Sequence, residues 1–184
     1  MQTGVYLRRH FICVNLGKSL DPILFLQTDQ RNQYGQNSQR KGTRDSLDIQ
    51  RVTNGAIELA LIIRRSFHKE GIEFFTPSHY SQQIGYMNRP AGYVIAPHVH
   101  NPVKREVHNT NEVLFIKSGR VRVDFYSEEQ NFLESVVLET GDVILLAYGG
   151  HGFEMLEQAE MIEVKQGPYA GDHDKTRFVP AKRT

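Results

Sequence analysis

The chain has 184 residues, with 22 Lys and Arg against 21 Asp and Glu, so its formal net charge is +1. This balance gives no global electrostatic reason to expect a nucleic acid or an anionic membrane as a partner. No apolar run approaches the roughly 20 residues needed to cross a bilayer. The single cysteine, Cys13, excludes an intrachain disulfide framework and a cysteine-cluster zinc site. We expect a reduced, cytoplasmic protein with one domain core.

Residues 1–52 are interpreted as an N-terminal extension followed by a polar linker. The apolar run Phe11–Val14 ends at Asn15, which is too short for the apolar region of an export signal. Residues 27–46 contain one aromatic side chain and no aliphatic residue larger than Gly. Such a stretch buries too little apolar surface to offset the entropy lost on ordering. The composition therefore predicts a mobile linker.

Residues 53–71 are predicted to form a short amphipathic helix. Asn54 is a suitable N-cap, and Ile57 and Leu61 lie on one helical stripe. Cations cluster near the end of the segment, where they suit a helix C-terminus, and Gly71 follows as a plausible stop. The pattern indicates a helix of about four turns whose broad apolar face packs on a sheet.

After Gly71 the residue pattern changes to short runs typical of β-strands, separated by residues typical of turns. We expect 112–116 to pair with 120–126 across a tight turn, and 132–138 to pair with 143–146. Many short antiparallel strands predict an all-β sandwich or jelly-roll barrel over 72–170, followed by a C-terminal tail, 171–184. The expected strands are 92–100, 112–116, 120–126, 132–138, 143–146, 151–156 and 161–166.

Three histidines and one glutamate are the candidate metal ligands of this chain. His98 and His100 are two residues apart on an expected strand, so both side chains point to one face and can bind one ion. Glu112 begins the next expected strand, and His151 follows a Gly-Gly turn. Imidazole and carboxylate ligands suit Fe, Mn, Zn, Ni or Co and leave positions for water or substrate.

Two motifs in this part of the chain resemble those of the cupin superfamily. The first runs Gly, five residues, His-x-His, a spacer, Glu, six residues, Gly, and the second begins with Gly and five residues before a turn and His. The second is present as Gly141 to His151, with Ala147 in place of the usual Pro. The first is present as Gly92, His98, His100, Glu112 and Gly119. The resemblance covers roughly residues 87–166.

The resemblance implies a jelly-roll cupin barrel that binds one divalent transition metal. The implied ligands are His98, His100, Glu112 and His151. The spacer between His100 and Glu112 is longer than the usual three or four residues, which leaves Glu106 and His108 as rival ligands. We prefer Glu112, because its distance to Gly119 and its position on an expected strand both match the motif.

Further residues are candidates for contacts with a substrate. His108 is a candidate acid/base that could swing over the pocket. Arg122 either contacts the substrate or is an outward surface charge. Asp172, His173 and Asp174 could mimic a metal site, but a solvated tail is the preferred interpretation. The substrate-binding candidates are Lys104, Arg105, Arg122, Tyr148 and Phe153.

The resemblance also sets the expected function. Cupins with this ligand set include metal-dependent dioxygenases and sugar-phosphate isomerases, so we expect a metalloprotein acting on a small, anionic or sugar-derived substrate. The stretch 162–169 is similar to the end of small cupins that accompany surface-polysaccharide synthesis, which favours a carbohydrate. The alternative is a non-catalytic cupin that binds a small molecule or acts as a sensor. In a third interpretation the metal has a structural role only and stabilises the barrel. Small cupins commonly form homodimers.

Overall fold

The computed structural model describes residues 48–180, so the predictions for residues 1–47 and for the last four residues lie outside the described part of the chain. All strand pairs in it are antiparallel, and it contains almost no helix beyond one short 3-10 helix, which confirms the all-β prediction. The elements are β1 (Ile49–Asn54), β2 (Ile57–Ile63), β3 (Gly71–Phe74), β4 (Gly85–Asn88), β5 (Glu112–Ser118), β6 (Arg120–Tyr126), β7 (Phe132–Glu139), β8 (Val143–Leu146), β9 (Gly150–Met155), β10 (Glu160–Lys165) and η1 (Gly171–Asp174).

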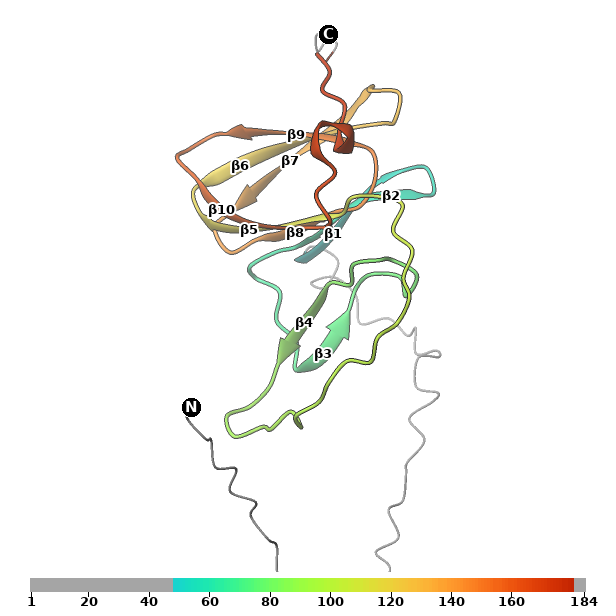
Figure 1. Ribbon diagram of the computed structural model, residues 1–184. Helices are drawn as coiled ribbons and strands as arrows, with labels where there is room; N and C mark the ends of the chain where they lie inside the picture. The colour runs from blue at the N-terminus through green and yellow to red at the C-terminus, as the bar shows by residue number, and fades with distance from the viewer. Residues whose placement is uncertain (1–47, 181–184) are drawn as a thin grey trace, which may run out of the picture. The chain divides into compact units, whose positions relative to one another are not determined.

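Two sheets form the body of this part of the chain (Figure 1). One has five strands in the order β1-β2-β8-β5-β10, and the other has three in the order β7-β6-β9. Alternate side chains of both sheets meet between them, as the period of two in a strand requires. The residues of this inner core are Val52, Leu59, Ala60, Ile62, Leu114, Ile116, Val121, Val123, Phe125, Val136, Leu138, Ile144 and Leu146. The two sheets do not join into a closed barrel within residues 48–180.

The middle of the five-stranded sheet is buried on both faces. Leu61, Val113 and Leu145 point away from the inner core and pack with Phe67 and Ile84, which follow β2 along the chain. Strands covered on both sides read as continuous apolar runs instead of alternating ones. This explains the continuous apolar runs of residues 59–63 in β2 and of β8.

The predicted helix over 53–71 is wrong, because this region holds the end of β1 and the whole of β2. The two strands form an antiparallel hairpin in which Asn54 pairs with Ile57. Gly55 between them has φ +62°, a conformation that Asn-Gly turns supply readily. The apolar run that resembles a broad helical stripe is a central strand buried on both faces. The domain boundary at residue 52 also shifts, since β1 begins at Ile49.

Six predicted strands are confirmed to within two residues, and they are 112–116, 120–126, 132–138, 143–146, 151–156 and 161–166. Their expected pairing is wrong. Strand β5 pairs with β8 and β10, whereas β6 pairs with β7 and β9. The tight turns at Gly119 (φ +81°) and Gly141 (φ +91°) therefore carry the chain from one sheet to the other instead of closing hairpins.

The predicted strand over 92–100 is also wrong. Residues 89–110 form a long connection between β4 and β5 that contains no strand (Figure 1). Every residue in it is exposed. The C-terminal residues likewise differ from the predicted tail, because residues 171–174 form η1 and the chain beyond it lines a cavity. Within the described residues, no helix has the length and apolar character needed to cross a membrane.

Candidate functional site

A cavity of about 640 Å³ opens where the first residue of β5, the start of β9 and the last residue of β10 come together. Its walls come from both sheets, from the loop before β5 and from the residues after η1. The lining side chains that bear charge or aromatic rings are His108, Glu112, Tyr126, Glu128, Tyr148, His151, Lys165, Asp174, Lys175, Arg177 and Phe178.

Glu112 and His151 face each other across the mouth between the two sheets. Glu112 lies on the same side of β5 as the core residue Leu114, because the two are separated by two positions. His151 stands opposite Phe125 in the β6–β9 ladder and so shares its inward direction. The two side chains meet with His151 Nε2 3.1 Å from Glu112 Oε2. Two of the four predicted metal ligands therefore come together, one from each motif.

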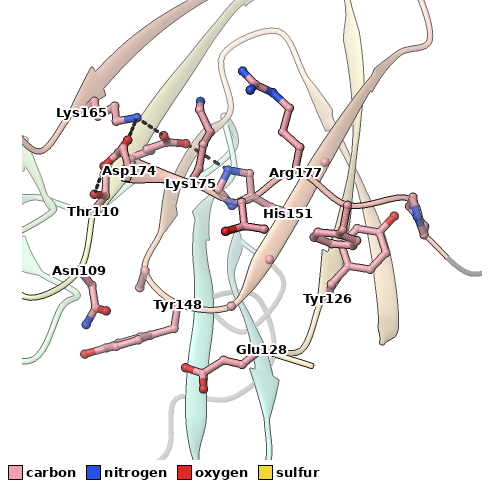
Figure 2. A pocket seen from close by; sticks show the side chains of 18 of the residues that line it. Asn109, Thr110, Tyr126, Glu128, Tyr148, His151, Lys165, Asp174, Lys175 and Arg177 are labelled. Carbon is pink, nitrogen blue, oxygen red and sulfur yellow. Dashed lines mark hydrogen bonds and ion pairs between the residues drawn. The ribbon is translucent and has the colours of Figure 1, made fainter. Parts of the chain in front are cut away.

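Lys165 extends this pair into a network. Its Nζ lies 3.2 Å from Glu112 Oε1, on the neighbouring strand, and 2.5 Å from an oxygen of Asp174. The hydroxyl of Thr110 donates a hydrogen bond of 2.8 Å to the other Asp174 oxygen. Figure 2 shows the three side chains converging beside His151. The residue before β5, the end of β10 and η1 are thus tied together at the cavity.

The charges in the network stabilise one another. The hydrogen bond with His151, supported by Lys165, lowers the pKa of Glu112, although burial acts in the opposite direction. Asp174 and Glu112 together raise the pKa of Lys165, with the hydrogen bond to Asp174 as the larger cause. Lys165 and then Thr110 lower the pKa of Asp174. At neutral pH both carboxylates are ionised, and Glu112 has the charge that a metal ligand needs.

The rest of the cavity wall combines cations with aromatic rings. Lys175 and Arg177 follow η1 and line the cavity, and the charge of Lys175 also helps to lower the pKa of the adjacent Asp174. The ring of Phe178 packs edge-on against Tyr126 at a centroid distance of 5.1 Å. Tyr148, a predicted substrate contact, lines the cavity as well. Such a wall suits a small ligand that has both an anionic group and a face that stacks on aromatic rings.

His98 and His100 lie away from the cavity, in the long connection between β4 and β5. Both are exposed, their rings are 5.2 Å apart, and His98 Nδ1 lies 3.0 Å from the carbonyl oxygen of Ala96. Neither residue lines the cavity that holds Glu112 and His151. The structure therefore keeps the two histidines next to each other, as expected, but does not bring them to the other two predicted ligands.

The remaining predicted residues divide between cavity and surface. His108 lines the cavity, and its Nε2 is 3.7 Å from the rival ligand Glu106. Lys104 and Arg105 are exposed on the connection. Arg122 is outside the cavity, on the face of β6 away from the core, where it pairs with Asp124 at 2.9 Å and with Glu154 at 2.5 Å. This outward surface charge is one of the two interpretations open for Arg122.

Phe153 lies on β9, two residues beyond His151, and its ring is tilted against the His151 ring at 5.4 Å. It is 38% exposed because β9 is an edge strand. Phe153 does not line the cavity, so its contact with a ligand stays a prediction.

The cavity residues that the sequence analysis missed include Thr110, Tyr126, Lys165, Asp174 and the residues that follow η1. For Lys165 a signal existed: it lies four positions after Met161 on a predicted strand, and Met161 packs on the core, so both point inward. For Asp174 the interpretation as a solvated residue is wrong, because Asp174 bonds Thr110 and Lys165. No local pattern marks a contact across 64 positions of sequence.

Within residues 48–180, the structure contains no group of three or more His, Cys, Asp or Glu side chains that could hold a metal ion. Comparison of the chain with models of protein families, with curated proteins and with solved structures finds no match.

Proposed function

We propose that this chain is a cupin-like metalloprotein that binds a small, anionic or sugar-derived substrate in the cavity at Glu112 and His151. The observation that carries the proposal is the meeting of these two residues. They are 39 positions apart, come from different sheets and belong to two separate motifs. A chance resemblance to both motifs gives no reason for their side chains to converge in one cavity.

The geometry of this pair fits two ligands of one metal ion. Ligand atoms about 2.1 Å from an ion, at bond angles of roughly 90–110°, lie about 3–3.5 Å from each other. The His151 and Glu112 atoms are 3.1 Å apart. Lys165 bonds the other oxygen of Glu112, so it orients the carboxylate as residues around metal ligands commonly do. His98 and His100 supply the right chemistry, but they reach the pair only if the connection that bears them lies against the cavity.

A divalent ion bound there would act as a Lewis acid toward a carbonyl or hydroxyl group of the substrate. The chain's own residues bind and orient that substrate. Lys175 and Arg177 provide two cations for an anionic group, such as a carboxylate or phosphate. Tyr148 and Tyr126 provide aromatic surface and hydroxyl groups for a sugar-like ring. His108, at the cavity wall, is placed to exchange a proton with the substrate. An isomerase or dioxygenase fits these roles.

Elemental analysis of the purified protein tests the proposal. Wild type is expected to contain about one equivalent of a transition metal per chain, and Glu112→Gln and His151→Ala are expected to lose it. His68→Ala is the matched control, since His68 is exposed and does not line the cavity. A folded wild type that takes up no metal after reconstitution would overturn the proposal. Metal-loaded protein is then screened with sugar-derived and keto-acid substrates, with and without oxygen.

A further inference from the structure

The chain after η1 lines the cavity and is held to the two-sheet body at two points. Residues 174–178 all contribute to the cavity wall, and we call them the strap. At the first point, the carboxylate of Asp174 forms an ion pair with Lys165. At the second point, the half-buried ring of Phe178 packs edge-on against Tyr126 at 5.1 Å. The strap is therefore fixed at both of its ends.

The two fixed points belong to different sheets. Lys165 ends β10 of the five-stranded sheet, whereas Tyr126 ends β6 of the three-stranded sheet. The backbone is extended at Lys175, with φ −151° and ψ 149°. Four residues of extended chain reach about 13 Å, which is enough to bridge two packed sheets about 10 Å apart. The strap thus runs from one sheet to the other beside the place where Glu112 and His151 meet.

The position of the Phe178 ring depends on a glycine. A Cβ at Gly150, the first residue of β9, would lie 3.4 Å from two atoms of this ring and 3.2 Å from the Cβ of Tyr126. The absence of a side chain at Gly150 leaves the room that the ring occupies. The strap therefore has a defined docking position, in which the Phe178 ring and the Asp174 carboxylate find their partners at the same time.

The strap carries two cations between its fixed ends. Lys175 and Arg177 are exposed, line the cavity and extend in the same direction in Figure 2. Side chains two positions apart in an extended segment point to the same side. Lys165, the third cation of the wall, is already paired with both Glu112 and Asp174. Lys175 and Arg177 are therefore the groups best placed to meet an anion that enters the cavity.

We propose that the strap closes the cavity over an anionic ligand. Lys175 and Arg177 hold the anionic group, and the contacts of Asp174 and Phe178 keep the strap where these cations reach it. Ligand binding and docking of the strap then favour each other, because coupling between two binding events is reciprocal. Asp174 and Phe178 are positioning residues and need no contact with the ligand. This inference rests on the proposed function for the cavity as the substrate site, but it requires no metal.

Inorganic phosphate is the probe for the two cations, and phosphorus NMR titration of the purified full chain measures its dissociation constant. Lys175→Gln with Arg177→Gln is expected to weaken phosphate binding by about tenfold or more, because charge-assisted hydrogen bonds are lost. Lys117→Gln with Arg120→Gln is the matched control, since it removes the same two charges at the turn between β5 and β6, outside the cavity. Equal affinities for the two double variants would overturn the proposal.

The positioning residues separate docking of the strap from simple electrostatics, because the two predict effects of opposite sign. Asp174→Asn removes a negative charge from the cavity wall, so electrostatics alone would tighten phosphate binding. Release of the strap instead weakens it, by roughly threefold or more, and Phe178→Ala should do the same without a change of charge. Asp172→Asn and Val179→Ala are matched controls at exposed neighbouring residues. Unchanged or tighter binding in Asp174→Asn or in Phe178→Ala would overturn the proposal.

The reciprocal effect is measured on the strap itself. The chain contains no Trp, so Phe178→Trp places a single fluorophore at the docking position. Val179→Trp places one at the next residue, which is 94% exposed. Phosphate is expected to reduce acrylamide quenching of the first variant and to leave the second unchanged. The same response in both variants would contradict the coupling between ligand and strap.

The metal content of wild type, measured beside these titrations, separates this inference from the proposed metal function. A wild type that binds phosphate but no metal overturns the metal function and supports the strap. A wild type that binds metal but no phosphate overturns the strap and leaves the metal function intact.

Discussion

The two-sheet body and the connection 89–110 have similar apolar residues in opposite surroundings. In the body, the alternation of side chains in β5, β6 and β8 matches the two faces of each sheet, so that residues such as Val121 and Ile144 are fully buried. In the connection, Val94 and Val99 are 78% and 87% exposed. The body is thus stabilised by dense apolar contacts within the chain, whereas the apolar residues of the connection bury much less of their surface.

This difference shows that residues of one sequence motif can lie in two different structural environments. The histidines of the first motif lie in the connection, and its glutamate lies at the start of β5 in the body. Glu112 is placed by strand pairing, whereas His98 and His100 lie on an exposed connection without strand pairing. The following substitutions compare the two regions, beginning with the largest expected effect.

Shortening a buried aliphatic side chain of the body should cost most. Ile144→Ala, in the inner core, is expected to lower the free energy of unfolding by about 2–5 kcal/mol, because it removes buried methylene groups and leaves a cavity. Val99→Ala, in the connection, should cost a single chain less than about 0.5 kcal/mol. Urea denaturation measures both. Equal costs for the two variants would contradict the comparison.

Asp142 is a buried charge whose partners hold the turn between β7 and β8. Its carboxylate accepts hydrogen bonds from Arg64, from the backbone N–H of Arg65 and from the backbone N–H of Glu139. Asp142→Ala leaves these donors without their acceptor, so a loss of about 2–4 kcal/mol is expected in thermal or urea unfolding. The exposed pair of Glu106 and His108 in the connection is the control, and Glu106→Ala should change stability by less than about 0.5 kcal/mol. A smaller loss for Asp142→Ala than for Glu106→Ala would contradict this account.

The two glycines of the first motif have the same backbone angle φ but differ in the room available for a side chain. Gly119 and Gly92 both have φ +81°, so an L side chain at either is strained by about 1 kcal/mol. A Cβ at Gly119 would also lie 2.2 Å from the carbonyl oxygen of Gln158, whereas a Cβ at Gly92 meets nothing within 4 Å. Gly119→Ala should therefore lower the melting temperature more than Gly92→Ala does. Equal shifts would mean that the turn at Gly119 opens without cost.

The smallest effect concerns Tyr80, which follows β3 and packs edge-on against Tyr148 at 5.9 Å. Burial raises the pKa of Tyr80, and Glu58 and Tyr148 add to the effect. A raised pKa means that ionisation is less favourable in the folded state. The stability linked to the neutral hydroxyl is present below the unfolded pKa, near 10, and falls as the pH rises through the folded pKa.

Tyr80→Phe removes this ionisation, so the stability of the variant should decline less than that of wild type between about pH 9 and pH 11. The expected difference is below about 1 kcal/mol, and urea midpoints measured across this range would reveal it. Parallel pH profiles for the two proteins would contradict the assignment.

Local patterns were sufficient for most of the body. Alternation along β6, and the Gly-containing turns that bound β5, β7 and β8, predicted these strands within two residues. The same approach failed for β2, because a strand buried on both faces has no alternation and resembles a helical stripe. It also failed for the pairing of β5 and β6, since a tight glycine turn can either close a hairpin or carry the chain to another sheet.

For the candidate site, the sequence by itself indicated which residues could take part: the histidines, Glu112 and Tyr148. Only the tertiary structure decided that Glu112 and His151 meet at 3.1 Å, and that Lys165 and Asp174 join them. The physical reason is the distance along the sequence between the residues that make up the site. Side-chain chemistry and strand periodicity are local properties of the chain, but a site built from two sheets and a C-terminal segment depends on long-range packing. The tertiary structure leaves His98 and His100 on an exposed connection, away from the cavity.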